Sequence, residues 1–148
     1  MTTDISEKGL ETIIMRHMTG TDGLDDAATM VAETPDELAA QKADGIGYWA
    51  GNAREFDRAH ALDVPQLFAF LHATQPKVFE KLGLGSYRDT KDINRLKFLT
   101  RLSAEIGKRG VIDVLRKGID FHPAGHFDLF YGTPSEGNVK AAQLHALN

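Results

Sequence analysis

The chain has 148 residues, 42% of them hydrophobic and 26% charged, with a formal net charge of -4, and these values fit one globular domain or a piece of a larger one. Cysteine is absent, which excludes disulfides and thiolate zinc sites, and no apolar run reaches the ~18 residues of a membrane-spanning helix. The pI of about 5.8 argues against a dedicated nucleic-acid-binding domain, and the N-terminus carries no secretion signal, so we expect a cytoplasmic protein.

Charge is distributed unevenly along the chain. Residues 22–44 contain seven acids and one base, a net charge of -6, whereas residues 91–117 contain eight bases and three acids, a net charge of +5. We expect a single domain over residues 1–148, without a second domain. The acidic stretch 22–44 is expected to be an insert, and the sequence leaves open whether it is ordered or mobile.

The N-terminal part predicts a helix over residues 6–18, with Ser6 as its N-cap. Its apolar residues recur at helical spacing and form one stripe: Leu10, Ile13, Ile14 and Met18. Residues 35–42 form a short helix in this prediction, with Pro35 in the first turn. Residues 45–63 are expected to be irregular, with an extended stretch over 55–62.

Two helices are predicted next. Asp63 and Gln66 stand at the spacing of a capping box, so a helix begins after Asp63. Thr74 is the expected cap of a third short helix, with Pro76 in its first turn and an end at Gly83. The expected inward-facing residues of both helices are Leu67, Phe68, Leu71, Val78, Phe79 and Leu82.

The longest predicted helix covers residues 91–108, with Asp89 or Thr90 as its cap. Its expected apolar face consists of Ile93, Leu96, Leu99, Leu102 and Ile106. Gly110 breaks this helix, residues 111–117 add one or two further turns, and Gly118 stops them. A last helix with Val139, Ala142, Leu144 and Leu147 on one face reaches the end of the chain.

Residues 126–131 alternate between apolar and polar positions and predict a strand. A strand needs hydrogen-bonding partners. Either residues 119–122 pair with it, or the partners lie outside this chain, and we favour the second prediction. The expected fold is α+β and predominantly helical, with about five or six helices and one or two short strands.

Basic residues of the long predicted helix form a stripe. Lys97, Arg101 and Lys108 fall within about 40° of one another at ~100° per residue. They and Arg116 are suited to contact DNA phosphates. A solvated helix face is the alternative interpretation.

Other motifs give weak indications of chemistry. His122 and His126 have a metal-like spacing, but a proline and a glycine lie between them, so a pair of turn histidines is the alternative and we predict no metal site. Asp89-Thr90-Lys91 resembles a nuclease tripeptide, but it precedes a helix, where a capping role is expected. No phosphate loop with a G-K-[ST] sequence occurs, so we predict no cofactor bound by this chain.

Three segments resemble the N-terminal part of the R (restriction) subunit of type I restriction-modification enzymes. They are EKGLETIIMRHM (residues 7–18), REFDRAHALDVPQLFAFLHATQPKVFEKL (54–82) and GKRGVIDVLRKGIDFHPAGHFDLFYGTPSEG (107–137). The second is similar to a Y-D-R-x-x-A-L-D motif that leads to T-Q-P, with Phe56 in place of the tyrosine. The third is similar to R-G-x-x-x-V-L-R-x-G followed by a strand. The acidic stretch 22–44 lies outside the resemblance.

The resemblance implies the incomplete front part of a PD-(D/E)XK-type nuclease domain. The parent of that family is an ATP-dependent DNA translocase that cleaves double-stranded DNA with Mg²⁺ and works with methyltransferase and specificity subunits. Its catalytic aspartate, glutamate and lysine are expected just beyond residue 148, and no residue here matches them. Glu11 corresponds to a helix glutamate that such nucleases place near the metal, although a surface glutamate is the alternative. The alternative function is a freestanding protein-protein or DNA-binding module without catalysis.

Overall fold

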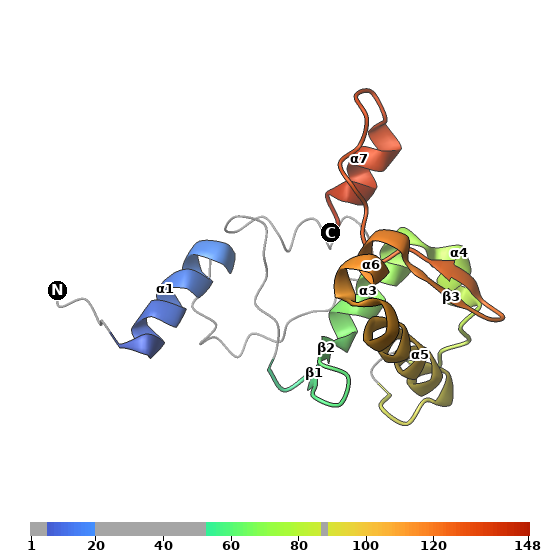
Figure 1. The fold of residues 1–148 in the computed structure, drawn as a ribbon, viewed down its shortest axis with the longest axis horizontal. Helices are drawn as coiled ribbons and strands as arrows, with labels where there is room; N and C mark the ends of the chain where they lie inside the picture. The colour runs from blue at the N-terminus through green and yellow to red at the C-terminus, as the bar shows by residue number, and fades with distance from the viewer. Residues whose placement is uncertain (1–5, 20–52, 87–88) are drawn as a thin grey trace.

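The computed structural model describes residues 6–19, 53–86 and 89–148 (Figure 1). These parts form six helices and two antiparallel strand pairs, so the predicted α+β class with a predominance of helix is confirmed. The elements are α1 (Glu7–Thr19), β1 (Phe56–Asp57), β2 (Leu62–Asp63), α3 (Val64–Thr74), α4 (Pro76–Glu80), α5 (Ile93–Arg109), α6 (Val111–Lys117), β3 (Ile119–Phe121), β4 (Gly125–Phe127) and α7 (Val139–His145). The predicted acidic insert and the helix over 35–42 lie outside the described residues.

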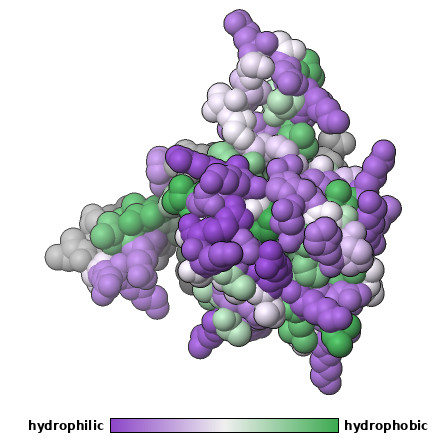
Figure 2. Space-filling view, turned by 45° about the vertical axis from the view of Figure 1, so that its right-hand side comes forward, coloured by the Kyte–Doolittle hydropathy of each residue, from purple (hydrophilic) through white to green (hydrophobic). Residues whose placement is uncertain are grey.

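Helix α1 begins as predicted, because the Gly9 N–H donates to Ser6 Oγ at 3.1 Å. Its apolar stripe, however, is uncovered: Leu10 is 57% exposed, and no residue of α1 is buried. Figure 1 shows α1 apart from the packed helices, and Figure 2 shows its hydrophobic side chains uncovered on the helix that projects at the left. The stripe therefore contributes nothing to the core among the described residues.

The core lies where α3, α4, α5 and α6 meet the β3–β4 hairpin. Phe98 of α5 is at its centre and is fully buried. Its ring centroid lies 5.7 Å from that of Phe68, 5.4 Å from that of Phe121 and 5.1 Å from that of Phe127. These tilted and edge-on arrangements are the ones aromatic pairs prefer. One aromatic side chain thus joins helix α3 to both strands of the hairpin.

Helix α5 begins later than predicted. Its N-cap is Asp92, whose Oδ1 accepts from the N–H groups of Asn94 at 2.8 Å and Arg95 at 3.0 Å, so the prediction of Asp89 or Thr90 is wrong. Asp89 instead accepts from the Lys91 N–H, within the turn before the helix. Asp92 also accepts from Gly85 N–H, a contact across seven residues that no local pattern indicates.

The predicted apolar face of α5 is also partly wrong. Ile93 is 65% exposed and Leu96 is exposed, whereas Phe98, Leu99 and Leu102 are buried. At ~100° per residue the three buried side chains share an arc of about 100°, and Ile93 lies on the opposite side of the helix. Arg95 lies within this arc and Glu105 lies beside it, and both are buried as well.

The two predicted caps of α3 and α4 have different outcomes. The predicted cap of α3 is confirmed, since the Gln66 N–H donates to Asp63 Oδ1 at 3.3 Å. The predicted cap of α4 is wrong, because Thr74 is the last residue of α3 and its hydroxyl donates to the Phe70 carbonyl. The N-cap position of α4 is Gln75, whose side chain is used elsewhere.

Strand β4 is shorter than the predicted strand over 126–131, and it pairs with β3 inside this chain. Ile119 lies opposite Phe127, and Phe121 opposite Gly125. Our preference for partners outside the chain is therefore wrong. Helix α6 ends at Gly118, and a turn of three residues reverses the chain after β3. Residues 119–127 are therefore long enough to form a hairpin on their own.

Two carboxamide side chains replace strand neighbours after β4. The Asp128 N–H donates to Gln75 Oε1 at 2.8 Å, and Gln75 Nε2 donates to the Asp128 carbonyl at 2.7 Å. In the same way, the Tyr131 N–H donates to Asn148 Oδ1 at 2.7 Å, and Asn148 Nδ2 donates to the Tyr131 carbonyl at 2.5 Å. The segment from Asp128 to Tyr131 is thus fastened at both ends by side chains instead of by a third strand.

Replacing Gln75 with leucine should lower the free energy of unfolding by about 1–3 kcal/mol, because both main-chain groups of Asp128 lose their partner. Urea denaturation followed by circular dichroism measures the change. Gln143→Leu is the matched control: Gln143 is exposed, and we expect its replacement to change stability by less than about 0.5 kcal/mol. Equal stability of the two variants would show that the hydrogen bonds between Gln75 and Asp128 do not stabilise the fold.

Candidate nucleic-acid interface

The basic stripe lies on the face of α5 that points away from the core. Lys97, Arg101 and Lys108 are all exposed. From Lys97 to Lys108 the helix rises by roughly 16 Å, which is enough to face several phosphates of one DNA strand. The buried arc on the opposite side of α5 fixes the orientation of the stripe, so helical periodicity correctly predicts it.

The three cations of the stripe are not equivalent. Arg101 Nη2 lies 3.1 Å from Glu105 Oε1, and Arg101 is only half exposed. Lys97 and Lys108 have no ion-pair partner in the parts of the chain that the structure describes. Arg116 is also exposed, but it lies on α6 and not on the helix that carries the stripe. Two free lysines therefore carry most of the positive charge that the stripe offers to an anion.

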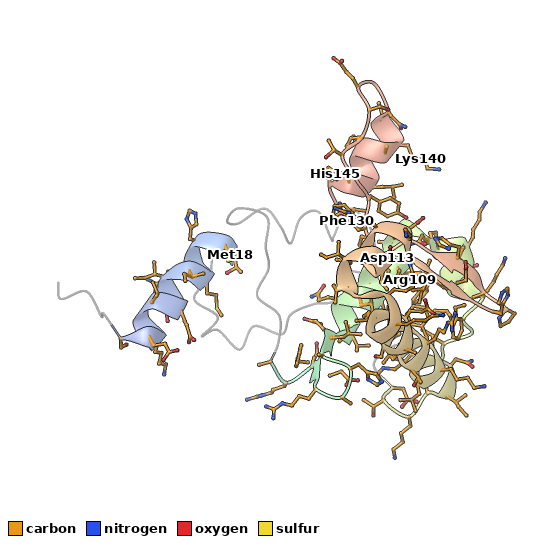
Figure 3. The ribbon with its side chains drawn as sticks, viewed as in Figure 1. Met18, Arg109, Asp113, Phe130, Lys140 and His145 are labelled. Carbon is orange, nitrogen blue, oxygen red and sulfur yellow. The ribbon has the colours of Figure 1, made fainter. Side chains whose placement is uncertain are left out.

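Arg109 is not available for DNA, because it crosslinks α5 to α6; Figure 3 labels it close to Asp113. Its Nε donates to Asp113 Oδ2 at 2.7 Å, and its Nη1 donates to Glu105 Oε2 at 3.2 Å and to the Gly118 carbonyl at 3.1 Å. The hydrogen bond from Lys117 and those from Arg109 hold the pKa of the Asp113 carboxyl below its usual value. This network joins the end of α5 to helix α6 and to Gly118, the C-cap of α6.

A second internal ion pair removes another basic side chain from those available to bind DNA. Arg95 is buried, and its Nη2 lies 3.7 Å from Asp57 Oδ2 in β1. Asp57 also accepts from the N–H groups of Ala59 and His60, which close the turn between β1 and β2. The F-D-R sequence at the start of the second resembling segment therefore connects a two-residue strand to the long helix.

The predicted histidine pair does not converge on a metal site. His126 Nδ1 lies 2.8 Å from Asp120 Oδ1, and its Nε2 lies 3.6 Å from Asp128 Oδ1. The hydrogen bond from His126 holds the pKa of Asp120 below its usual value. Residues 6–19, 53–86 and 89–148 contain no group of three His, Cys, Asp or Glu side chains arranged to hold a metal ion.

Glu11, the weak catalytic candidate, lies on α1 and is exposed. No described carboxylate or histidine is grouped with it as a potential metal ligand. The structure therefore brings together three of the predicted DNA contacts on α5 and leaves Arg116 and Glu11 on separate elements.

Sequence reasoning missed a cavity between the α3–α4 corner, β4 and α7, with a volume of about 850 Å³. Its walls come from three segments that are far apart in the chain, residues 73–78, 126–128 and 140–147. No spacing within one segment indicates it.

Comparison of the chain with protein-family models, with curated proteins and with solved structures gave no match. Among residues 6–19, 53–86 and 89–148, no helix combines the length and apolar character of a bilayer-spanning segment.

Proposed function

We propose that this chain is the N-terminal portion of the nuclease domain in the R subunit of a type I restriction-modification enzyme. In that role it is the helical front of a PD-(D/E)XK-type fold in a cytoplasmic complex with DNA and with the methyltransferase and specificity subunits. The parent enzyme translocates DNA with ATP and cleaves both strands with Mg²⁺. This chain supplies scaffold and phosphate contacts from Lys97, Arg101, Lys108 and Arg116.

The observation that carries this proposal is the packing of the second resembling segment against the third. Gln75 of the T-Q-P sequence holds both main-chain groups of Asp128, which is 53 residues later in the chain. The core contains side chains from both segments, among them Phe68 and Phe127. The two resembling segments thus hold one another in place, which supports interpreting them as parts of one motif.

The residues present do not fit the magnesium centre of such a nuclease. Glu11 lies on an exposed helix, and Asp120 and Asp128 are each directed to His126. We therefore assign no step of phosphodiester hydrolysis to this chain. In the proposal the carboxylates and the lysine that perform it lie on strands beyond residue 148.

The gene sequence beyond codon 148 and two purified proteins test this proposal. We expect the reading frame to continue into strands with an aspartate, a glutamate and a lysine, and we expect the longer protein to cleave plasmid DNA when Mg²⁺ is present. The 148-residue chain alone should leave the plasmid intact. A stop codon at position 149, or Mg²⁺-dependent cleavage by the short chain, would overturn the proposal.

A second candidate function is a freestanding DNA-binding or protein-protein module without catalysis. The pairing of β4 with β3 favours it, because the described core closes without strands from elsewhere. A stop codon after residue 148, combined with salt-dependent binding of duplex DNA by the chain, would support this second function and reject the first.

Both functions that involve DNA predict that the α5 stripe binds phosphate. The double variant Lys97→Glu/Lys108→Glu should bind a duplex oligonucleotide at least about ten-fold more weakly at low salt, and the slope of log K against log salt should fall by about 2. Fluorescence anisotropy over a salt series measures both. Lys81→Glu/Lys91→Glu makes the same change of net charge at exposed positions outside the stripe and should lose less than about three-fold. Equal losses, or no binding by the unaltered chain, would exclude the interface.

A further inference from the structure

The cavity beside α7 has an apolar floor. Leu147 is almost fully buried and packs against Phe70 and Ala73 in a small cluster separate from the main core. Pro76 and Val78 line the α4 side, and Leu144 lines the α7 side. A volume of about 850 Å³ lies within the range of small-molecule sites, roughly 300–1,000 Å³.

The walls of this cavity are fastened to one another. The α3–α4 corner is tied to the end of β4 through Gln75 and Asp128. Helix α7 is tied to the same extended segment, because His145 Nδ1 lies 2.7 Å from the Tyr131 carbonyl and Asn148 holds both main-chain groups of Tyr131. A ligand would therefore meet a largely preformed site and would order little of the chain on binding.

Two lysines are among the residues that line the cavity. Lys77 of α4 and Lys140 of α7 both line it, and neither has an ion-pair partner in the described parts of the chain. Figure 3 shows Lys140 extending from α7 on the same side as α4. The one carboxylate in the lining, that of Asp128, is directed to His126 at 3.6 Å. The lining thus offers two lysines against one acid that already has a partner.

We propose that this cavity binds a small organic anion, one with an apolar body of one or two rings and a single sulfonate, phosphate or carboxylate group. The apolar body fills the floor formed by Val78, Leu144 and Leu147, and the anionic group lies between Lys77 and Lys140. The inference does not rest on the nuclease proposal, because it uses no residue of the α5 stripe and no resembling motif beyond the Gln75 clamp.

The shape of the cavity favours a small molecule over a protein segment. A helix is about 10–12 Å across with its side chains, and a cavity of this volume, with three walls fastened together, admits a body of one or two rings more readily than a helix. The two lysines of the lining favour a ligand with an anionic group, which a neutral hydrophobic molecule lacks.

Fluorescence titration with 8-anilinonaphthalene-1-sulfonate tests the site, with neutral N-phenyl-1-naphthylamine as the comparison probe. Lys77→Ala/Lys140→Ala should weaken binding of the sulfonate by about five-fold or more, since each exposed lysine contributes modestly, and should leave the neutral probe within about two-fold. Ala146 lines the cavity and is exposed, so Ala146→Trp should fill part of the cavity with a large ring. This variant should abolish binding of both probes. Lys81→Ala/Lys91→Ala, with the same charge change elsewhere, should bind both probes like the unaltered chain.

The sulfonate probe also binds partly unfolded proteins, so the unfolding midpoint of each variant is measured in parallel. Unchanged sulfonate affinity in the folded Lys77→Ala/Lys140→Ala variant would overturn the proposed anion site. Unchanged binding of both probes in folded Ala146→Trp would show that they bind elsewhere and would overturn it as well. Neither result would bear on the cleavage and DNA-binding tests above.

Discussion

Phe98→Ala should lower the free energy of unfolding by about 3–5 kcal/mol, the largest loss expected from any single side chain of the core. The ring is fully buried and lies within 5.7 Å, centroid to centroid, of Phe68, Phe121 and Phe127. Alanine would remove these contacts and leave a cavity between α3, α5 and the hairpin. Guanidinium denaturation, monitored by circular dichroism and by tyrosine fluorescence, measures the loss.

The control for this prediction is Phe130→Ala, since Phe130 is 45% exposed and is not part of the core cluster. Its replacement should cost less than about 1 kcal/mol. If Phe98→Ala fails to fold, Phe98→Leu keeps most of the volume and should still cost roughly 1–2 kcal/mol. A loss below 1 kcal/mol for Phe98→Ala would show that the hairpin does not pack on α5 as described.

Gly118→Ala should destabilise the chain by at least about 3 kcal/mol, for two separate reasons. Gly118 has φ 63° and ψ -165°, a region of backbone conformation that is almost restricted to glycine. A Cβ there would also overlap the carbonyl oxygen of Phe127 and lie 2.7 Å from His126 Nε2. Because the first obstacle is main chain in the paired strand β4, it has little freedom to move away.

Gly110→Ala separates the two causes. Gly110 has φ 82° and ψ 155°, and nothing lies within 4 Å of the position of its Cβ. This variant should therefore show only the conformational cost, about 1–3 kcal/mol. Gly107→Ala, inside α5 and in open space, should instead stabilise the chain by about 0.5–1 kcal/mol. Equal costs at positions 118 and 110 would show that β4 does not approach the end of α6.

Local signals predict the ends of several elements correctly. Ser6 and Asp63 cap their helices as expected, and Gly110 and Gly118 end theirs, because capping and helix termination depend on residues within one turn. The failures involve contacts between distant residues. The cap of α5 is Asp92, which also binds the main chain at Gly85, and this second contact gives Asp92 a role that local preferences do not show.

The buried face of α5 shows the same limit. A hydrophobicity pattern does not place Arg95 in the interior, yet Asp57 of β1 lies beside its guanidinium and makes burial of the charge tolerable. Ile93, which the pattern places inside, has no core residue opposite it and stays exposed. Phe98, Leu99 and Leu102 therefore define the buried face of this helix, and a distant ion pair accounts for the one arginine buried with them.

For the candidate sites, too, the sequence predicts features of a single element and misses those that depend on contacts between distant residues. Helical periodicity predicts the lysine stripe because it concerns one helix. The basic excess of residues 91–117 overstates the charge that is free, since Arg95, Arg109 and Lys117 are paired with acids. Arg109 and Lys117 each stand four residues from Asp113, a spacing visible in the sequence, whereas only the fold reveals the pairing of Arg95 with Asp57. The cavity depends on three segments brought together by Gln75 and Asn148, and no feature within one segment predicts it.

The side-chain clamps after β4 also bear on how the protein behaves at high concentration. An unpaired strand edge recruits strands of neighbouring molecules and is a common origin of aggregation. Here the carboxamides of Gln75 and Asn148 occupy the main-chain groups of Asp128 and Tyr131, so an incoming strand finds the first and last positions of this stretch already taken. The two side-chain amides therefore block edge-to-edge association of this segment with a strand of another molecule.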